Sequence, residues 1–277
     1  MPEDPRPLPT ACSLLAACAA LGLAACGQAP TDRSIDTSAS TATLRVCLPE
    51  NDPPRARRGG GGLDADVAGD LAAGLGRRLT IVWLPEEEQT DIESTDIDFR
   101  PLFGGQCDLQ LSVPTGAVER FRGWLVLSKP YYGAGFELIP EDSAFRFGSA
   151  FPGTVAVRAN TVAHLALNVA GVDWSQQSSN AGIVQAVAEG RAAAGLVWGP
   201  QLAILDVDPN ADFEAPPVLH WNLHAAFRRD TALRGDVDRL FASKEFQAEV
   251  GKRLIEHRIP IRGPFESAHS TADLLAL

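Results

Sequence analysis

The sequence predicts an α/β protein made of two lobes that are joined by a two-strand hinge, with a ligand cleft between them. Two strand–helix–strand patterns follow one another, the first within residues 43–85 and the second from residue 154 onward. Such a pattern predicts parallel strands, because a parallel connection needs room for a crossover helix. A later extended segment near residues 223–228 provides a second crossing between the lobes. Two crossings form a hinge, and the cleft beside a hinge is a natural site for a small ligand.

The first lobe is predicted from turn signals and apolar spacing. The run TLRVCL over residues 43–48 predicts a strand, and two prolines and four glycines make residues 51–62 a loop. Asp64 is expected to cap the next helix, in which apolar residues recur at every fourth position until Gly76 ends it. The run LTIVWLP, residues 79–85, predicts the second strand.

The segment CDLQLSVPTGAVERFRGWLVLSKPYY predicts one wall of the cleft. It combines a strand over residues 107–113, a polar turn that carries Arg120, and an apolar run that ends in the only two tyrosines of the chain. Extended pieces are expected at residues 125–127 and 135–139, on either side of the tyrosines. We expect the segment to line the cleft and then to lead into the first hinge strand.

The second lobe and the C-terminal region follow the same signals. The expected elements are a strand over residues 154–160, a helix capped by Asn160 or Thr161 that runs to Val169, a helix over 183–190, a strand over 193–198, and amphipathic helices over 231–243 and 244–257. We therefore expect lobe 1 to contain residues 43–133 and 229–277, and lobe 2 to contain residues 134–228 with the hinge strands.

The composition excludes one class of partner. The chain has 277 residues and a formal net charge of −11, and an acidic protein of this kind is a poor partner for nucleic acid. The densest acidic stretch, residues 86–98, lacks the glycine that the tight turn of a calcium loop needs. We interpret it as a solvated surface loop, and we predict neither a metal nor a cofactor.

Residues 1–26 are interpreted as a targeting segment. Residues 11–25 are small or apolar apart from Ser13, and the run is too short for a comfortable membrane span. It ends in LGLAAC, which resembles a bacterial lipobox, so Cys26 is expected to be lipidated and to become the mature N-terminus. The alternative is an ordinary signal peptide with a coincidental cysteine. The polar residues 27–42 are expected to form a flexible tether.

Two cysteines remain in the expected mature domain besides the lipidated one. Cys12 and Cys18 leave with the signal, and Cys47 and Cys107 stay. In an oxidising compartment these two residues allow one disulfide, and the alternative is two separate buried thiols.

The sequence contains no pattern typical of an enzyme. It has no G-x-S-x-G motif, no H-E-x-x-H motif and no Cys–His pairing that survives processing. His220 and His224 are four residues apart, but Pro216, Pro217 and Trp221 argue against a helix there. These histidines are interpreted as ordinary residues near the hinge.

Four segments together resemble the family 3 extracellular solute-binding proteins of ABC importers. The resemblance covers residues 43–260. Its segments, in chain order, are LRVCLPENDPP, GLDADVAGDLAAGLG, GGQCDLQLSVPTGAVERFRGWLVLSKPYY and AEGRAAAGLVWGP. They match an opening strand and loop, a helix start, a strand that leads to Thr, Arg and Pro-Tyr-Tyr, and a second-lobe strand. The resemblance implies the type II periplasmic-binding-protein fold.

The resemblance also implies ligand-binding roles for matching positions. Thr115 and Arg120 match the Thr and Arg that hold the carboxylate of the ligand, and a guanidinium suits a carboxylate because it binds both oxygens at once. The loop RANTV, with Arg158 and Thr161, matches the loop that closes on the ligand from the second lobe. Amides at a helix N-terminus would favour an anion there.

Three positions of the ligand region depart from the family pattern. The usual Gly of the second-lobe loop falls near Val162. Trp198 stands where amino-acid binders have an Asp for the α-ammonium group of the ligand. Arg55 stands near the place of an aromatic residue that stacks on the ligand. The sequence therefore lacks the residues with which this family usually binds an α-amino acid. A cleft with Arg55, Arg120, Arg158 and Trp198 better suits an anionic or aromatic ligand, or no small molecule at all.

The motifs RVC, CDLQLSVPTG, KPYY and LVWGP further resemble the solute-binding-like proteins associated with periplasmic PQQ-dependent dehydrogenases such as methanol dehydrogenase. Two functions follow from the resemblance. The first is capture of a small solute for an ABC permease, and the second is a non-transport role as partner of a quinoprotein dehydrogenase. Both imply a periplasmic, non-enzymatic protein, lipid-anchored to the inner or outer membrane of a Gram-negative-type bacterium.

Overall fold

The computed structural model describes residues 42–85 and 97–266. All of them belong to one compact unit. Cys26, the expected signal and tether, and most of the acidic stretch lie outside the described residues. Within the described part, no helix has the length and apolar character that a membrane span requires.

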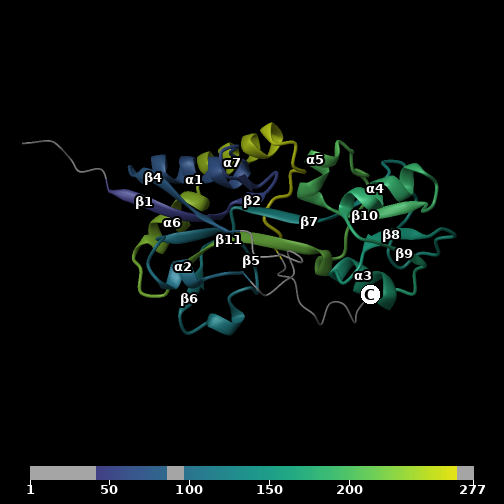
Figure 1. Cartoon of the computed structure of the whole chain (residues 1–277), viewed down its shortest axis with the longest axis horizontal. Coiled ribbons are helices and arrows are strands. Elements are labelled where there is room, and N and C mark those ends of the chain that lie inside the picture. Colours follow the sequence, from purple (N-terminus) through teal and green to yellow (C-terminus); the bar gives the residue numbers. More distant parts are fainter. Residues whose placement is uncertain (1–41, 86–96, 267–277) are drawn as a thin grey trace, which may run out of the picture. The chain divides into compact units, whose positions relative to one another are not determined.

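A nine-stranded sheet forms the frame of the described unit, with the strand order β4-β1-β5-β11-β7-β10-β8-β9 and with β6 paired to β11 (Figure 1). Its strands are β1 (Thr43–Pro49), β4 (Arg78–Leu84), β5 (Leu109–Pro114), β6 (Leu125–Leu127), β7 (Tyr132–Ile139), β8 (Val155–Arg158), β9 (Trp174–Gln177), β10 (Ala194–Trp198) and β11 (His220–Arg228). A separate hairpin joins β2 (Asn51–Asp52) to β3 (Ala56–Arg57). The parallel pairs β1–β4, β1–β5 and β8–β10 join strands that the sequence predicted. The parallel pair β8–β9 was not predicted, because β9 was not expected as a strand.

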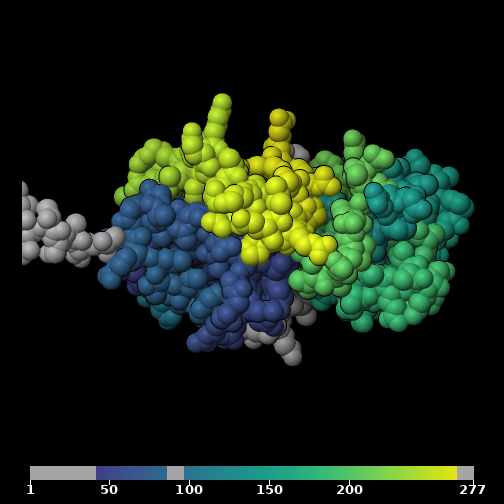
Figure 2. All heavy atoms as spheres, turned by 90° about the horizontal axis from the view of Figure 1, so that it is seen from above, coloured from purple at the N-terminus to yellow at the C-terminus, as the bar shows by residue number. Residues whose placement is uncertain are grey.

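The helices pack against the two halves of the sheet. They are α1 (Leu63–Gly74), α2 (Arg100–Phe103), α3 (Val162–Val169), α4 (Asn180–Ala188), α5 (Leu202–Leu205), α6 (Leu233–Phe241) and α7 (Lys244–Glu256). Helices α1, α6 and α7 contact one another, and Figure 2 shows the yellow end of the chain lying against the blue α1 region. Helices α3 and α4 contact β8 in the other half.

The start of α1 differs from the prediction that Asp64 caps it. The capping position is occupied by Gly62, and Asp64 lies inside the first turn with its side chain fully buried. The reason is tertiary, because the Asp64 carboxylate accepts hydrogen bonds from Ser112 of β5 and from Tyr131 instead of from its own helix. The C-terminal end of α1 is as predicted, because Gly76 takes the left-handed backbone (φ 62°) that ends the helix.

Two strands connect the halves of the sheet. Residues Tyr132 to Gly135 of β7 pair with β11, whereas Phe136 to Ile139 of the same strand pair with β10. Strand β11 pairs with β7 at its start and with β5 and β6 further along. Strands β7 and β11 therefore form the hinge. The lobe boundaries given above, residues 43–133 with 229–277 and residues 134–228, stay a prediction.

Residues 259–266, here called the C-terminal strap, cross this hinge. Gly133 of β7 donates its N–H to the Arg262 carbonyl over 3.1 Å, and the Phe265 ring stacks on His220 with ring centroids 4.1 Å apart. A side chain on Gly133 would collide with the strap, since an added Cβ would lie 2.5 Å from the Gly263 oxygen. The Arg262 guanidinium pairs with Glu137 of β7 at 2.6 and 2.9 Å, although Glu137 is only 2% exposed.

We expect Arg262→Gln to lower the free energy of unfolding by about 1–3 kcal/mol, because it leaves the buried Glu137 carboxylate without its cation while the partly exposed Arg262 site admits some solvent. The matched control is Arg258→Gln, which breaks an ion pair with Asp206 between two exposed side chains and should cost at most about 1 kcal/mol. Urea unfolding followed by tryptophan fluorescence measures both. Equal midpoints for the two variants would contradict the importance of the strap.

Candidate functional site

The hinge-side ends of β5 and β7 are anchored to α1 through Asp64. Tyr131 donates its hydroxyl to Asp64 Oδ1 at 2.7 Å and accepts the Ser112 N–H at 3.1 Å. The Ser112 hydroxyl donates to the other carboxylate oxygen. Ser112 adopts a left-handed backbone (φ 62°), which costs about 1–3 kcal/mol for a residue other than glycine unless the surroundings hold it. These hydrogen bonds supply that support, so one of the two tyrosines is explained by structure rather than by ligand contact.

Arg55 lies inside this anchor rather than in an open cleft. It is 6% exposed and forms an ion pair with Asp52, the residue that precedes the hairpin turn. The turn is held over α1, because the Leu63 and Asp64 N–H groups bond to the Pro54 and Arg55 carbonyls at 3.2 and 2.8 Å. The geometry therefore directs Arg55 toward buried carboxylates and does not favour the ligand contact expected from the sequence.

The electrostatics of the buried cluster fit a structural role. Burial raises the pKa of Asp52 to about 6, although the Arg55 charge acts in the opposite direction. Burial likewise raises the pKa of Asp64, against Arg55 and the hydrogen bonds from Ser112 and Tyr131. The Tyr132 hydroxyl is buried near the Arg55 charge and forms no well-aligned hydrogen bond with any residue that the structure describes. Burial raises the pKa of both tyrosines, so they remain protonated.

Thr115 follows β5 and faces the middle of β11. Its N–H donates to the Asn222 carbonyl at 3.0 Å, and its Oγ1 lies 2.9 Å from Nε2 of His224. Nδ1 of His224 lies 2.7 Å from the Ser128 carbonyl oxygen. Thr115 is half-buried and lies beside the hinge, as its expected role requires. Both of its hydrogen-bond donors, however, have partners within the protein.

Arg120 stands five residues further on, in the short 3₁₀ turn Glu119–Phe121, and its side chain is exposed. The turn is closed by the Glu119 N–H, which donates to the Gly116 carbonyl at 3.0 Å, and by the Phe121 N–H, which donates to the Val118 carbonyl at 2.8 Å. Arg122 in the same segment is also exposed and pairs with Glu119. Arg120 is therefore accessible from solvent, where a ligand or a protein partner could reach it.

The second-lobe loop has the predicted capping geometry. Thr161 caps α3 by accepting the His164 N–H at 3.1 Å, and its hydroxyl donates to the Arg158 carbonyl at 2.9 Å. Asn160, just before it, takes a left-handed backbone (φ 60°). Arg158 ends β8 and is half-buried. Arg158 and Thr161 therefore lie next to each other, but the Thr161 hydroxyl is used to cap α3.

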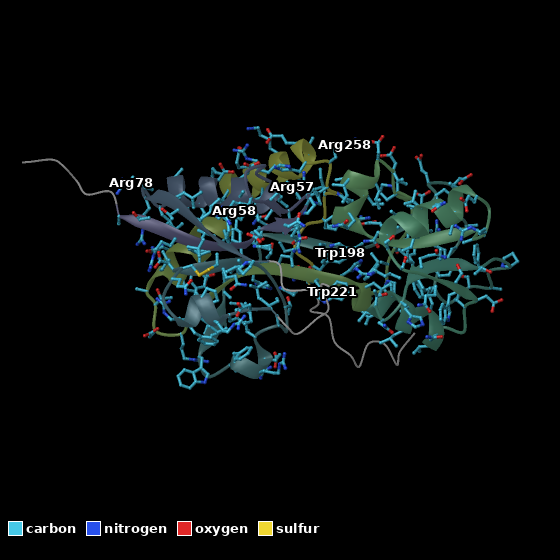
Figure 3. The ribbon with its side chains drawn as sticks, in the orientation of Figure 1. Arg57, Arg58, Arg78, Trp198, Trp221 and Arg258 are labelled. Atoms are coloured by element: carbon cyan, nitrogen blue, oxygen red, sulfur yellow. A yellow bond between two sulfur atoms is a disulfide. The ribbon has the colours of Figure 1, made fainter. Side chains whose placement is uncertain are left out.

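Trp198 lies at the hinge in an aromatic cluster that the sequence did not predict. Its ring meets Phe136 and Trp221 edge-to-face, with centroids 5.7 and 5.6 Å apart, and Figure 3 shows the two tryptophans close together in the middle of the described unit. Trp198 is 4% exposed, and its Nε1 has no hydrogen-bond partner within the described part of the chain. A buried N–H donor without a partner is costly, so this group is a candidate donor to an acceptor on a ligand.

The structure thus separates the six predicted ligand residues. Thr115 and Trp198 lie beside the hinge strands, Arg158 and Thr161 lie together at the start of α3, Arg120 is exposed in its turn, and Arg55 is buried with Asp52. Sequence reasoning missed the polar face of β11, which His220, Asn222 and His224 form at alternate positions and in which Asn222 and His224 are buried. A surface hollow of about 290 Å³ between α5 and the end of α7 contains none of the predicted ligand residues.

Comparison with known proteins identifies the fold. No family model matches the chain, and no curated protein sequence matches it. Among solved structures, the chain is similar to the unliganded, open L-cystine solute receptor of Neisseria gonorrhoeae, with a TM-score of 0.65 and 17% identity over 81% of this chain and 96% of that one. It is similar to MxaJ from Methlophaga aminisulfidivorans, with a TM-score of 0.59 and 17% identity over 79% of this chain and 99% of that one. It is also similar to the periplasmic binding protein XoxJ of Methylobacterium extorquens, with a TM-score of 0.54 and 18% identity over 80% and 100% of the two chains.

These neighbours establish the architecture. The chain has the type II periplasmic-binding-protein fold, as the sequence motifs predicted, and its structural neighbours are solute-binding proteins. At sequence identities of 17–18%, the similarity supports the fold but does not identify a ligand.

Proposed function

We propose that this chain is a periplasmic, lipid-anchored solute-binding protein that captures a small anionic organic solute for an ABC importer. The observation that carries the proposal is the two-strand hinge, with Thr115 on one half of the sheet and Trp198 on the other, whose indole N–H has no hydrogen-bond partner among the described residues. Exposed Arg120 supplies a cation on the Thr115 side, and half-buried Arg158 supplies one on the Trp198 side. A solute bound between the halves would join these groups, and hinge closure would remove it from water.

A second candidate is a non-transport role as partner of a periplasmic PQQ-dependent dehydrogenase. Two observations favour it: the motifs resemble that subgroup, and the hydroxyl groups of the predicted ligand residues Thr115 and Thr161 are hydrogen-bonded within the protein. In this role the fold is kept while the cleft no longer serves a solute.

A thermal-shift screen of the mature domain, residues 27–277, tests the first candidate. The probes are amino acids, dicarboxylates, aromatic acids, sulfonates and pyrroloquinoline quinone. A ligand at about 100 times its Kd stabilises the folded state by about 2.7 kcal/mol, which corresponds to a rise of several degrees in Tm. Arg120→Ala should abolish the rise, whereas Arg122→Ala, in the same turn, should leave it unchanged.

The same preparation distinguishes the two candidates. A Tm rise that both arginine variants retain would remove Arg120 from the site. No rise with any probe, together with co-purification of a quinoprotein dehydrogenase from the same periplasm, would replace solute capture by the partner role.

A further inference from the structure

The hydrogen bonds around His224 determine what Thr115 can offer to a ligand. A carbonyl oxygen only accepts, so the 2.7 Å contact between Nδ1 and the Ser128 carbonyl requires a proton on Nδ1. A neutral imidazole carries one proton, and Nε2 is then an acceptor. Thr115 Oγ1 lies 2.9 Å from Nε2 and 3.3 Å from the Asn222 carbonyl oxygen, and both of these atoms are acceptors. The hydroxyl therefore donates its proton to the nearer acceptor, Nε2 of His224.

The remaining donor of Thr115 is also engaged. Its backbone N–H donates to the Asn222 carbonyl at 3.0 Å. Thr115 thus presents only hydroxyl lone pairs to its surroundings. Lone pairs repel a carboxylate oxygen and accept from a hydroxyl, an ammonium or an amide N–H.

We propose that His224 is a specificity-determining residue, which makes Thr115 a hydrogen-bond acceptor and so selects a solute that carries a donor group beside its anionic group. The inference rests on the proposed solute-binding function and names its substrate class: hydroxy acids, amino acids or amide-bearing acids rather than simple carboxylates. Protonation of His224 reverses the bond, because Nε2 then donates to Thr115 and the hydroxyl proton turns to the Asn222 carbonyl at 3.3 Å.

The surroundings of His224 favour its neutral form. Burial lowers the pKa of His224, against the smaller opposing effects of the Ser128 hydrogen bond and of Asp238 on α6. Asp238 accepts the Lys129 N–H at 2.6 Å and is paired with Arg234 at 3.4 Å, which offsets its charge. Among the described residues, Asp238 is the charged group that acts on His224. Reversal is therefore expected only below the ordinary histidine pKa of about 6.5.

The first test needs no ligand. Nitrogen NMR of the ¹⁵N-histidine-labelled mature domain at about pH 8 should show His224 with a protonated Nδ1 and an unprotonated Nε2, with the resonances assigned by their loss in His224→Phe. In Thr115→Val the same tautomer should remain, and the Nε2 resonance should shift because its donor is gone. In Thr115→Ser the wild-type resonance should return. A proton on Nε2 of neutral His224 would overturn the proposal.

The second test compares two probes that differ by one hydroxyl group, mandelate and phenylacetate. At about pH 8 the wild type should bind mandelate about 2- to 10-fold more tightly, the ratio expected for one added hydrogen bond. Thr115→Val should lose this preference and Thr115→Ser should keep it.

The outcomes separate the two proposals. Equal binding of both probes by wild type and Thr115→Val would overturn the selectivity of His224 while leaving solute capture intact. Binding of neither probe would count against solute capture of this class, and the polarity of the His224–Thr115 bond would still be decided by the NMR experiment.

Discussion

Replacement of Arg55 by methionine is expected to lower the free energy of unfolding by about 3–5 kcal/mol, a large part of the stability of a typical domain. Arg55 is the cation of a buried cluster that contains Asp52 and Asp64. Methionine fills a similar volume but leaves two carboxylates in the interior without their counter-charge. The change also removes the contact that orders the loop before α1. Urea unfolding at about pH 8 measures the effect.

The control for this prediction is Arg57→Met, two residues away in the same hairpin. Arg57 is exposed, and Figure 3 labels it on the hairpin side of the described unit. Its replacement should change the free energy of unfolding by no more than about 0.5 kcal/mol. If the two methionine variants unfold at the same urea concentration, the buried cluster does not hold the loop.

The pH dependence of the Arg55→Met deficit provides a second readout. The Arg55 charge lowers the pKa of both carboxyl groups in the folded protein, so its removal raises those values further above the unfolded ones. The folded variant then binds more protons than its unfolded state, and its stability rises as pH falls. The deficit relative to wild type should therefore shrink between about pH 8 and about pH 5. A deficit that grows over this range would show that the cluster is not the cause.

Loss of the Cys47–Cys107 disulfide is expected to lower the free energy of unfolding by about 4 kcal/mol. Of the two alternatives that the sequence left open, the structure contains the bonded one, with the two residues 60 positions apart and their Cα atoms 5.6 Å apart. A cross-link over this length restricts the unfolded chain, which is the source of the estimate. Both cysteines also lie in an apolar cluster with Leu102, Val113 and Leu125, so little water reaches the bond.

The test compares the wild type with Cys47→Ala/Cys107→Ala, each with and without reductant. Reduced wild type and the double variant should have similar urea midpoints, both well below that of oxidised wild type, and reductant should not affect the double variant. An oxidised wild type no more stable than its reduced form would show that the cross-link adds nothing. The expected loss fits a protein that folds in an oxidising compartment.

Much of the fold could be predicted from the sequence because its signals are local. The helix over residues 63–74 ends at Gly76 in a left-handed backbone, and Thr161 caps the helix after β8. Alternating elements predicted the parallel pairs on either side of the hinge. Each of these features depends on residues a few positions apart, so spacing and residue type are sufficient evidence.

The roles of Asp64, Arg55 and Thr115 were decided only by the tertiary structure. Asp64 has the residue type of a helix cap, yet its partners Ser112 and Tyr131 lie 48 and 67 positions away. Thr115 has the residue type of a carboxylate donor, yet its Oγ1 lies 2.9 Å from Nε2 of His224, which is 109 positions away. Such a side chain can bond either to its own helix or turn or to a distant residue. Folding favours the arrangement that leaves the fewest buried polar groups without a hydrogen bond, and this arrangement depends on contacts between distant parts of the chain.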